Sequence, residues 1–98
     1  MGTQPTRVDR EAVRADWAAQ GFSCELWVDP PTQVWHDVQH EVDVLLLLLE
    51  GNSLLEFDNR ILRLLPGDEI CIRAGTRFTV RNQDEAPTRW LHGYRWNG

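Results

Sequence analysis

Residues Thr32–Asn82 read TQVWHDVQHEVDVLLLLLEGNSLLEFDNRILRLLPGDEICIRAGTRFTVRN. Short apolar stretches in this segment alternate with Gly, Pro, Asn and Asp, the residues that tight turns favour. The pattern predicts strands over Gln33–Glu50, Leu54–Phe57 and Arg60–Leu65, and the first is long enough to bend or to carry a bulge. Asp58–Asn59, whose residues tolerate positive φ, predicts a two-residue hairpin turn. Many short strands with regular turns indicate an antiparallel sandwich or barrel.

The rest of the chain extends this pattern on both sides. Further strands are predicted over Phe22–Val28 and Thr88–Arg95 from their alternation of apolar and polar residues. Glu69–Arg73 and Arg77–Asn82 are separated by the turn residues Ala74–Thr76, so we expect them to form a hairpin. The strands therefore continue almost to the end of the chain.

The N-terminal segment predicts a short helix. Asp9 is a good N-cap for a helix over Arg10–Gln20, and Gly21 is a good residue to end it. With 98 residues the chain is the size of one domain. We divide it into a leader and short helix over residues 1–21 and a β domain over residues 22–98.

Charge and hydropathy exclude two classes of partner. The chain has a net charge of −5 at pH 7 and no run of basic residues, so we expect no nucleic-acid partner. The N-terminus lacks the apolar segment of a secretory leader. The longest purely apolar run, Val44–Leu49, is too short to cross a bilayer. We therefore expect a cytoplasmic protein with no membrane partner.

Two blocks of the chain carry regular spacings of glycine and polar residues. The first block is formed by Thr32, Val38, His40, Val44 and Gly51. In its spacing it resembles the first motif of the cupin family, G-x5-H-x-H-x3-E-x6-G. His40 and Gly51 are the residues of that motif that the chain keeps.

The second block is formed by Gly67, Arg73, Gly75, Phe78 and Asn82. It resembles the second cupin motif, G-x5-P-x-G-x2-H-x3-N, again without a gap. Gly67, Gly75 and Asn82 are kept. The resemblance implies an all-β fold, an antiparallel jelly-roll β-barrel, here with a short N-terminal helix.

The resemblance also implies where a metal would be bound. Metal-binding cupins use two histidines and a glutamate of the first motif and the histidine of the second. Those positions carry Val38, His40, Val44 and Phe78 here, so three of the four ligand types are lost. The motif is that of a degenerate metal site.

Loss of the ligands favours a small-molecule pocket that works without a metal. The small interior of such a barrel is filled by its own side chains or shaped for one small ligand. The residues that we predict to line it are Val38, His40, Val44, Phe78, Trp90 and Tyr94. The predicted function is binding or sensing of a small molecule, with no cofactor assigned.

A metal-dependent enzyme is the first alternative. Strand alternation places His36 on the face of His40, and His92 lies on the last predicted strand. If all three point inward, they form a substitute site for a divalent transition metal. Cupin relatives include dioxygenases and isomerases, so the residues leave open whether the protein is an enzyme.

A dimeric structural protein without pocket chemistry is the second alternative. Leu45, Leu47 and Leu49 lie opposite an apolar face that already points to the core, so something must cover them. The candidates are the helix with Val13 and Trp17 or a second subunit. Because that helix is short and its apolar stripe is narrow, we predict a homodimer.

Overall fold

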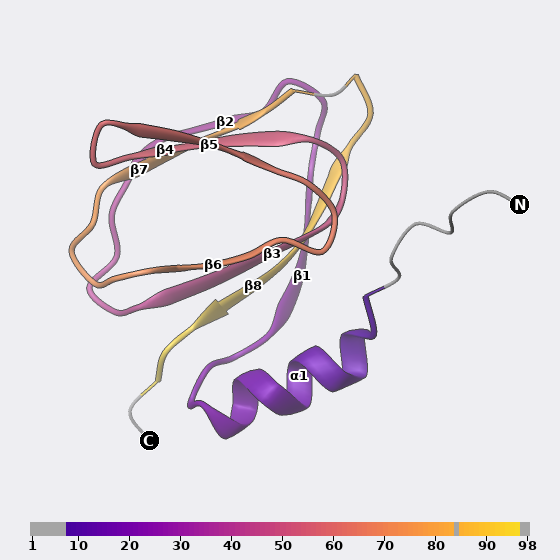
Figure 1. Cartoon of the computed structure of the whole chain (residues 1–98), viewed down its shortest axis with the longest axis vertical. Coiled ribbons are helices and arrows are strands. Elements are labelled where there is room, and N and C mark those ends of the chain that lie inside the picture. Colours follow the sequence, from indigo (N-terminus) through magenta and orange to yellow (C-terminus); the bar gives the residue numbers. More distant parts are fainter. Residues whose placement is uncertain (1–7, 84, 97–98) are drawn as a thin grey trace, which may run out of the picture.

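The computed structural model describes residues 8–83 and 85–96 of the chain. Within these ranges a single helix, α1 (Arg10–Ala19), precedes eight strands, which form two four-stranded antiparallel sheets. The two sheets lie face to face, and α1 lies against the outside of one of them (Figure 1). The predicted all-β jelly roll with a short N-terminal helix is confirmed. Most of the predicted leader falls on residues 1–7, outside the described residues.

The first sheet has the order β1-β8-β3-β6. Its strands are β1 (Glu25–Asp29), β8 (Thr88–Tyr94), β3 (Val44–Glu50) and β6 (Glu69–Ile72). Strand β8 lies at its centre, paired with β1 on one side and with β3 on the other. The first sheet therefore joins the two ends of the β domain to its leucine-rich strand.

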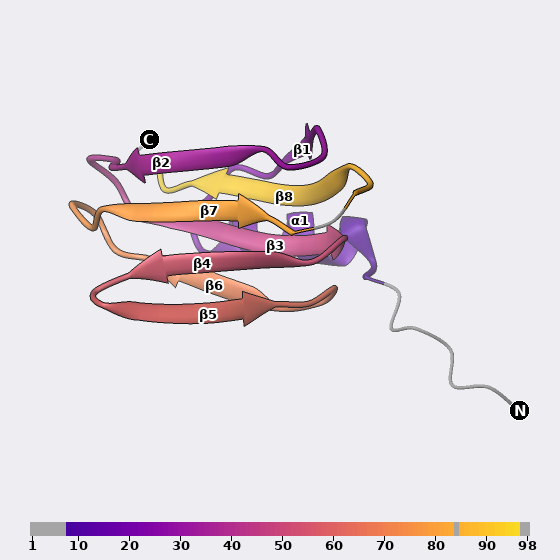
Figure 2. The same cartoon turned by 90° about the horizontal axis from the view of Figure 1, so that it is seen from above.

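The second sheet has the order β2-β7-β4-β5, as the view in Figure 2 shows. Its strands are β2 (Val34–Val38), β7 (Phe78–Asn82), β4 (Ser53–Phe57) and β5 (Arg60–Leu64). Strands β4 and β5 form the hairpin predicted from Asp58–Asn59, whose φ angles are 50° and 60°. Each sheet keeps its own pairing, so the hydrogen-bonded strands make a two-layered jelly roll and not one closed cylinder.

The predicted hairpin of Glu69–Arg73 with Arg77–Asn82 is wrong. Strand β6 pairs with β3 in the first sheet, whereas β7 pairs with β2 and β4 in the second. The turn between them crosses from one sheet to the other and is held from outside: Ala74 donates its N–H to Asp43 Oδ1 at 2.8 Å, and Gly75 donates to the His40 carbonyl at 2.9 Å. Local alternation cannot distinguish such a crossing from a hairpin.

The core lies between the two sheets. The inward side chains of both sheets form one buried cluster of Val44, Leu46, Leu48, Leu55, Leu64, Ile72, Phe78, Val80 and Trp90. Alternation along β3 sends Val44, Leu46 and Leu48 into this cluster, as the sequence predicts. Burial of a large apolar side chain contributes about 1.5–3 kcal/mol, so this cluster is the main source of stability of the fold.

A second buried cluster lies on the outer face of the first sheet, beneath α1. Leu45 and Leu47 of β3 and Leu91 of β8 pack there against Trp17 and Phe22. Trp17 is 0% exposed, and Leu45 and Leu47 are 4% and 5% exposed. The expectation that α1 is too short to cover the leucine row is therefore wrong for Leu45 and Leu47, whereas Leu49 at the end of the row is only partly buried. The large indole of Trp17 covers an area of these leucines that a narrow stripe of small side chains would leave exposed.

Helix α1 is fixed at its start, at its middle and at its end. The Asp9 side chain accepts hydrogen bonds from the N–H groups of Glu11 and Ala12, which makes it the predicted N-cap. Trp17 Nε1 donates to Glu69 Oε1 at 2.9 Å and so ties the helix to β6. Gly93 makes room for the indole, because a Cβ there would overlap the Ser23 carbonyl and lie 2.8 Å from the Trp17 ring.

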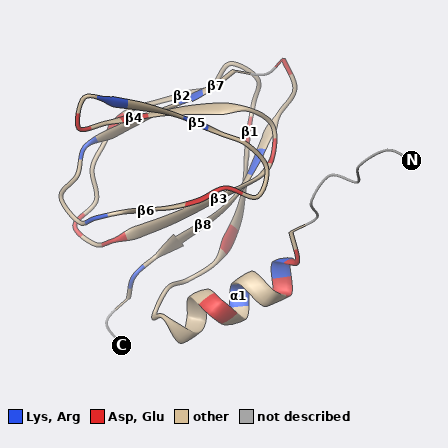
Figure 3. Cartoon of the chain, in the orientation of Figure 1, with Lys and Arg blue, Asp and Glu red and all other residues tan. Residues whose placement is uncertain are grey.

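Charged residues are spread over the helix, the turns and the strand ends, with both signs intermixed (Figure 3). Among the described residues no helix is long and apolar enough to cross a membrane.

Candidate functional site

A bulge in β2 selects the side chains that face the interior. The pairing of β2 with β7 joins Trp35 to Val80 and Val38 to Phe78, and the register shifts between these two pairs. Asp37 in the bulge has a φ of 49° and donates its N–H to Thr79 Oγ1 at 3.1 Å. The extra residue of the bulge shifts the alternation of inward and outward side chains along β2. Trp35 and Val38, on either side of the bulge, therefore both face the interior, and His36 is exposed.

Strand β8 supplies the opposite wall of the interior by simple alternation. Leu91 points outward under α1, and Trp90 points into the core. His92 pairs with Glu25 of β1 and with Leu46 of β3, and it is 2% exposed. His92 therefore faces the interior, at the end of the core where the packed apolar side chains stop.

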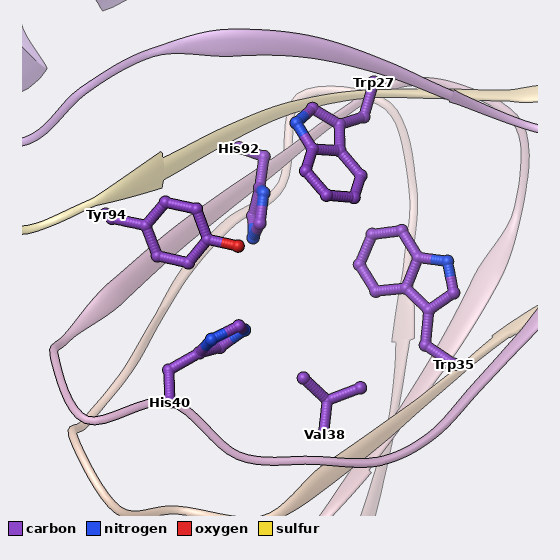
Figure 4. Close-up of a pocket in the computed structure, with 6 residues that line it drawn as sticks. All are labelled: Trp27, Trp35, Val38, His40, His92 and Tyr94. Carbon is purple, nitrogen blue, oxygen red and sulfur yellow. The ribbon is translucent and has the colours of Figure 1, made fainter.

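A cavity of about 180 Å³ opens beside His92. We call it the aromatic pocket; it is lined by Trp27, Trp35, Val38, His40, His92 and Tyr94. In Figure 4 the Tyr94 hydroxyl and the rings of both histidines turn toward one side of this space, and the two indoles and Val38 border the other. The pocket thus has a polar side and an apolar side.

The rings of the pocket meet edge to face. Trp27 contacts Trp35 with ring centroids 5.7 Å apart at an interplanar angle of 65°. Tyr94 contacts His92 at 4.6 Å and His40 at 5.0 Å, again in T-shaped arrangements. Such pairs are favourable because the positive edge of one ring meets the negative face of the next. The rings that form the walls of the pocket therefore pack against one another.

His92 is buried without a hydrogen-bond partner. Among the described residues neither its Nδ1 nor its Nε2 is within hydrogen-bond geometry of a donor or an acceptor. Burial, with a smaller contribution from His40, lowers the pKa of His92 from 6.5 to about 4. The ring is therefore neutral at pH 7 and presents one N–H donor and one nitrogen acceptor.

The neighbours of His92 are neutral as well. Burial lowers the pKa of His40, whose ring centroid lies 6.2 Å from that of His92. Burial, with a smaller contribution from the Glu25 carboxylate, raises the pKa of Tyr94. The polar side of the pocket is thus made of uncharged groups at pH 7.

Asp29 lies deeper in the interior, next to the tryptophans. It is 7% exposed, and burial raises the pKa of its carboxyl. The indole N–H groups of Trp35 and Trp90 act in the opposite direction by favouring the carboxylate. Trp90 Nε1 does not reach full hydrogen-bond geometry, so its effect on Asp29 is that of a nearby dipole. Asp29 thus lies beside Trp35 and outside the residues that line the pocket.

The predicted lining is only partly the observed one. Val38, His40 and Tyr94 line the aromatic pocket. Phe78, Val44 and Trp90 are packed inside the core cluster, because Leu46, Leu48 and Ile72 fill the space around them.

Three lining residues were outside the predicted pocket: Trp27, Trp35 and His92. The alternation of β8 was a signal for His92, since it places that residue on the face of Tyr94. For Trp35 there was no such signal, because its inward position depends on the bulge in β2.

The proposed set of three metal-binding histidines is not brought together. His40 and His92 face the aromatic pocket, but the bulge leaves His36 exposed on the other face of β2. Across residues 8–83 and 85–96 no group of three or more His, Cys, Asp or Glu side chains could hold a metal ion. Two neutral imidazoles do not make a resident metal site, which needs further ligands and their supporting partners. The donor set of the pocket does not fit a metal.

Comparisons with known proteins bear on the fold. No protein-family model matches the sequence, and no curated protein matches it. Among solved structures, a cupin superfamily protein from Desulfitobacterium hafniense DCB-2 aligns with a TM-score of 0.69 and 17% identity over 78% of this chain and 68% of that one.

Two further solved structures align equally well. A Cupin 2 conserved barrel domain protein from Salinispora arenicola CNS-205 gives a TM-score of 0.69 and 18% identity over 80% of this chain and 65% of that one. The Cupin_2 domain of an XRE family transcriptional regulator from Enterobacter cloacae gives a TM-score of 0.69 and 14% identity over 84% of this chain and 90% of that one. The turns of both sequence motifs lie where the resemblance places them, between strands of two facing sheets. The chain therefore has the fold of the cupin superfamily.

Proposed function

We propose that this chain is a cytoplasmic protein that binds one small molecule in the aromatic pocket without a metal. The observation that carries the proposal is His92, which is 2% exposed and has no hydrogen-bond partner at either nitrogen among the described residues. Leaving a buried polar group unpaired costs about 1–3 kcal/mol, and native proteins keep few such groups. A bound ligand that pairs with His92 recovers that free energy.

The shape of the pocket supports the same conclusion. Five of its six lining residues are aromatic, and the cavity of about 180 Å³ lies next to the unpaired ring. Binding sites are typically apolar cavities with a few polar groups that fix the orientation of the ligand. Because the walls hold one another in edge-to-face contact, the site is largely formed before the ligand enters.

A role in sensing is consistent with such a pocket. The structurally similar Cupin_2 domain from Enterobacter cloacae belongs to a transcriptional regulator. By analogy of fold, we propose that this chain reports the presence of its ligand to another component.

Filling the pocket tests the proposal. In Val38→Phe a ring replaces the smallest lining side chain and occupies the cavity. The matched control is Val28→Phe, at a 51% exposed position on β1 that does not line the pocket. Single-ring compounds that raise the melting temperature of the wild type should do so in the control and not in Val38→Phe, because a ligand stabilises only a state that binds it. Compounds that stabilise all three proteins equally would contradict the proposal.

The purified protein is expected to carry little transition metal. The pocket offers two neutral imidazoles, and Val38 lies where the related motif has a metal ligand. Elemental analysis after purification in the presence of added Zn²⁺, Fe²⁺ or Mn²⁺ should find far less than one equivalent. Close to one equivalent that is lost in His40→Ala would favour the metal-enzyme alternative.

The homodimer predicted from the sequence stays a prediction, with a different surface. Leu45 and Leu47 are already covered by α1, so they no longer provide the reason. The exposed apolar side chains of the edge strands β1 and β5 now provide it, with Val28 at 51% and Ile61 at 66%. Light scattering after gel filtration should give twice the monomer mass at micromolar concentration, and a monomer mass would contradict it.

A further inference from the structure

We infer that the ligand of the aromatic pocket is an uncharged molecule with a single aromatic ring and a hydroxyl group on it. The inference rests on the proposed function and narrows it to one chemical class. It follows from three features of the pocket: its unpaired polar side, its ring-lined side and its lack of compensating charge.

The polar side calls for a hydroxyl group. His92 is neutral at pH 7, and its acceptor nitrogen is without a donor in the described structure. A ligand hydroxyl donates to that nitrogen and still has lone pairs to accept a hydrogen bond in return. The Tyr94 hydroxyl turns toward the same side of the pocket and is placed to donate it (Figure 4). A ligand without a donor would leave that acceptor nitrogen of His92 unpaired.

The apolar side calls for a ring. Trp27, Trp35 and Val38 border the side of the pocket away from the histidines (Figure 4). The indole rings of Trp27 and Trp35 are 5.7 Å apart at 65°, so they offer an edge and a face to a third ring. Aromatic rings gain free energy from such contacts beyond that of burying apolar area.

The charges around the pocket exclude an anion and disfavour a cation. No lysine or arginine is among the described residues that line it, so a ligand carboxylate would be buried without a partner. No aspartate or glutamate is among those lining residues either: Glu25, which acts on Tyr94, is exposed to solvent, and the buried Asp29 acts on Trp35 from outside the lining. An ammonium group would therefore lose its hydration and gain only the faces of the aromatic rings, without a lining carboxylate as counter-ion.

The volume sets the size of the ligand. A cavity of about 180 Å³ is close to the engineered apolar cavity of about 150 Å³ that binds benzene. It has room for one ring with a small substituent. Phenol is the simplest molecule of the class and serves as the probe.

Calorimetric titration at pH 7 with four probes of nearly equal size tests the inference. Phenol carries the hydroxyl, toluene replaces it with a methyl group, benzoate adds a negative charge and benzylammonium adds a positive one. We expect phenol to bind with a dissociation constant of about 1 mM or tighter, since so small a ligand has few contacts. Toluene should bind about tenfold more weakly, because it leaves His92 unpaired. Both charged probes should bind more weakly than phenol.

The variant His92→Phe isolates the contribution of the imidazole. It keeps a ring at the position and removes both nitrogens, so phenol should fall to the affinity of toluene while toluene is unaffected. His36→Phe is the matched control, since His36 is exposed and does not line the pocket, and it should preserve the tenfold preference. The comparison of phenol with toluene on the wild type stands even if a variant fails to fold.

The possible outcomes distinguish an error in the ligand class from an error in the proposed function. Binding of toluene, benzoate or benzylammonium as tightly as phenol would overturn the ligand class and leave the proposed pocket standing. A preference for phenol that survives in His92→Phe would overturn the role of His92. No binding of any probe would overturn both the ligand class and the proposed function.

Discussion

Trp17→Ala is expected to lower the free energy of unfolding by about 3–5 kcal/mol, the range for truncating a buried tryptophan to alanine. Trp17 is 0% exposed and fills the space between α1 and the outer face of the first sheet. The variant also loses the hydrogen bond from Trp17 Nε1 to Glu69 Oε1. Urea unfolding followed by circular dichroism measures the change. Such a loss is a large fraction of the stability of a typical domain.

The same variant should associate. Without the indole, Leu45 and Leu47 become accessible on a sheet whose other face is already apolar. An apolar sheet face of this kind is prone to aggregation. We therefore expect Trp17→Ala to show a larger mass in light scattering than the wild type at equal concentration.

Trp96→Ala is the matched control, because it makes the same substitution at a tryptophan that is 60% exposed. Its unfolding free energy should change by about 0.5 kcal/mol or less, as is usual for surface positions. Equal losses in the two variants would show that the indole of Trp17 does not hold α1 on the sheet. That result would favour the alternative that a second subunit covers Leu45, Leu47 and Leu49.

The second large expected effect is that the free energy of unfolding falls as the pH is lowered, and that His92→Phe abolishes the part of this fall that is due to His92. Between pH 7 and pH 4.5 the wild type should lose about 2–3 kcal/mol of unfolding free energy through His92 alone. In His92→Phe this contribution to the loss should disappear. At pH 7 the variant should in addition be more stable by about 1–3 kcal/mol, because it no longer buries two unpaired nitrogens.

The direction follows from the lowered pKa of His92. Burial moves it from 6.5 to about 4 in the folded protein. Between these values the unfolded chain binds a proton that the folded protein rejects, so stability is fully present above pH 6.5 and is lost as the pH falls toward 4. Asp29 acts in the opposite direction, since its raised pKa makes the folded protein the better proton acceptor. Comparing variant with wild type removes the contribution of Asp29, which is present in both.

Urea titrations at a series of pH values between 4.5 and 7.5 provide the measurement. His36→Phe serves again as the control and should keep the wild-type slope, because His92 is intact in it. If His92→Phe is less stable than the wild type at pH 7 and keeps the same slope, the imidazole has a hydrogen-bond partner in solution. That result would contradict the proposal that a ligand forms hydrogen bonds with His92.

The two effects place stability and binding in different regions of the fold. Trp17 and the leucines beneath it hold the helix on the outer face and do not line the pocket. His92 lowers stability at the opposite face of the same sheet. Proteins tolerate such a local cost at sites that act on a ligand.

The sequence by itself determined most of the strands and most of their turns. Alternation of apolar and polar residues and the positions of Gly, Asp and Asn place these strands to within a few residues. The one strand predicted over Gln33–Glu50 is wrong, because it is divided into β2 and β3, which lie in different sheets. The Asp58–Asn59 hairpin and the Asp9 cap are found where they are predicted. These features depend on residues that are close in the chain, whose conformational preferences act locally. The spacing of the two motifs then indicated the fold.

Only the tertiary structure decided which faces are covered and which side chains meet. The bulge at Asp37 turns His36 outward and Trp35 inward, and it arises from the pairing of β2 with β7. The chain also crosses from one sheet to the other between β6 and β7, as the pairing of each strand with distant strands requires. The contact of Trp17 with Gly93 likewise joins residues far apart in the chain. A one-residue change of register reverses the face of every side chain that follows it, so local pattern cannot predict such a site. The aromatic pocket depends on that register, because β2 and β8 supply four of its six lining residues, while β1 supplies Trp27 and the segment after β2 supplies His40.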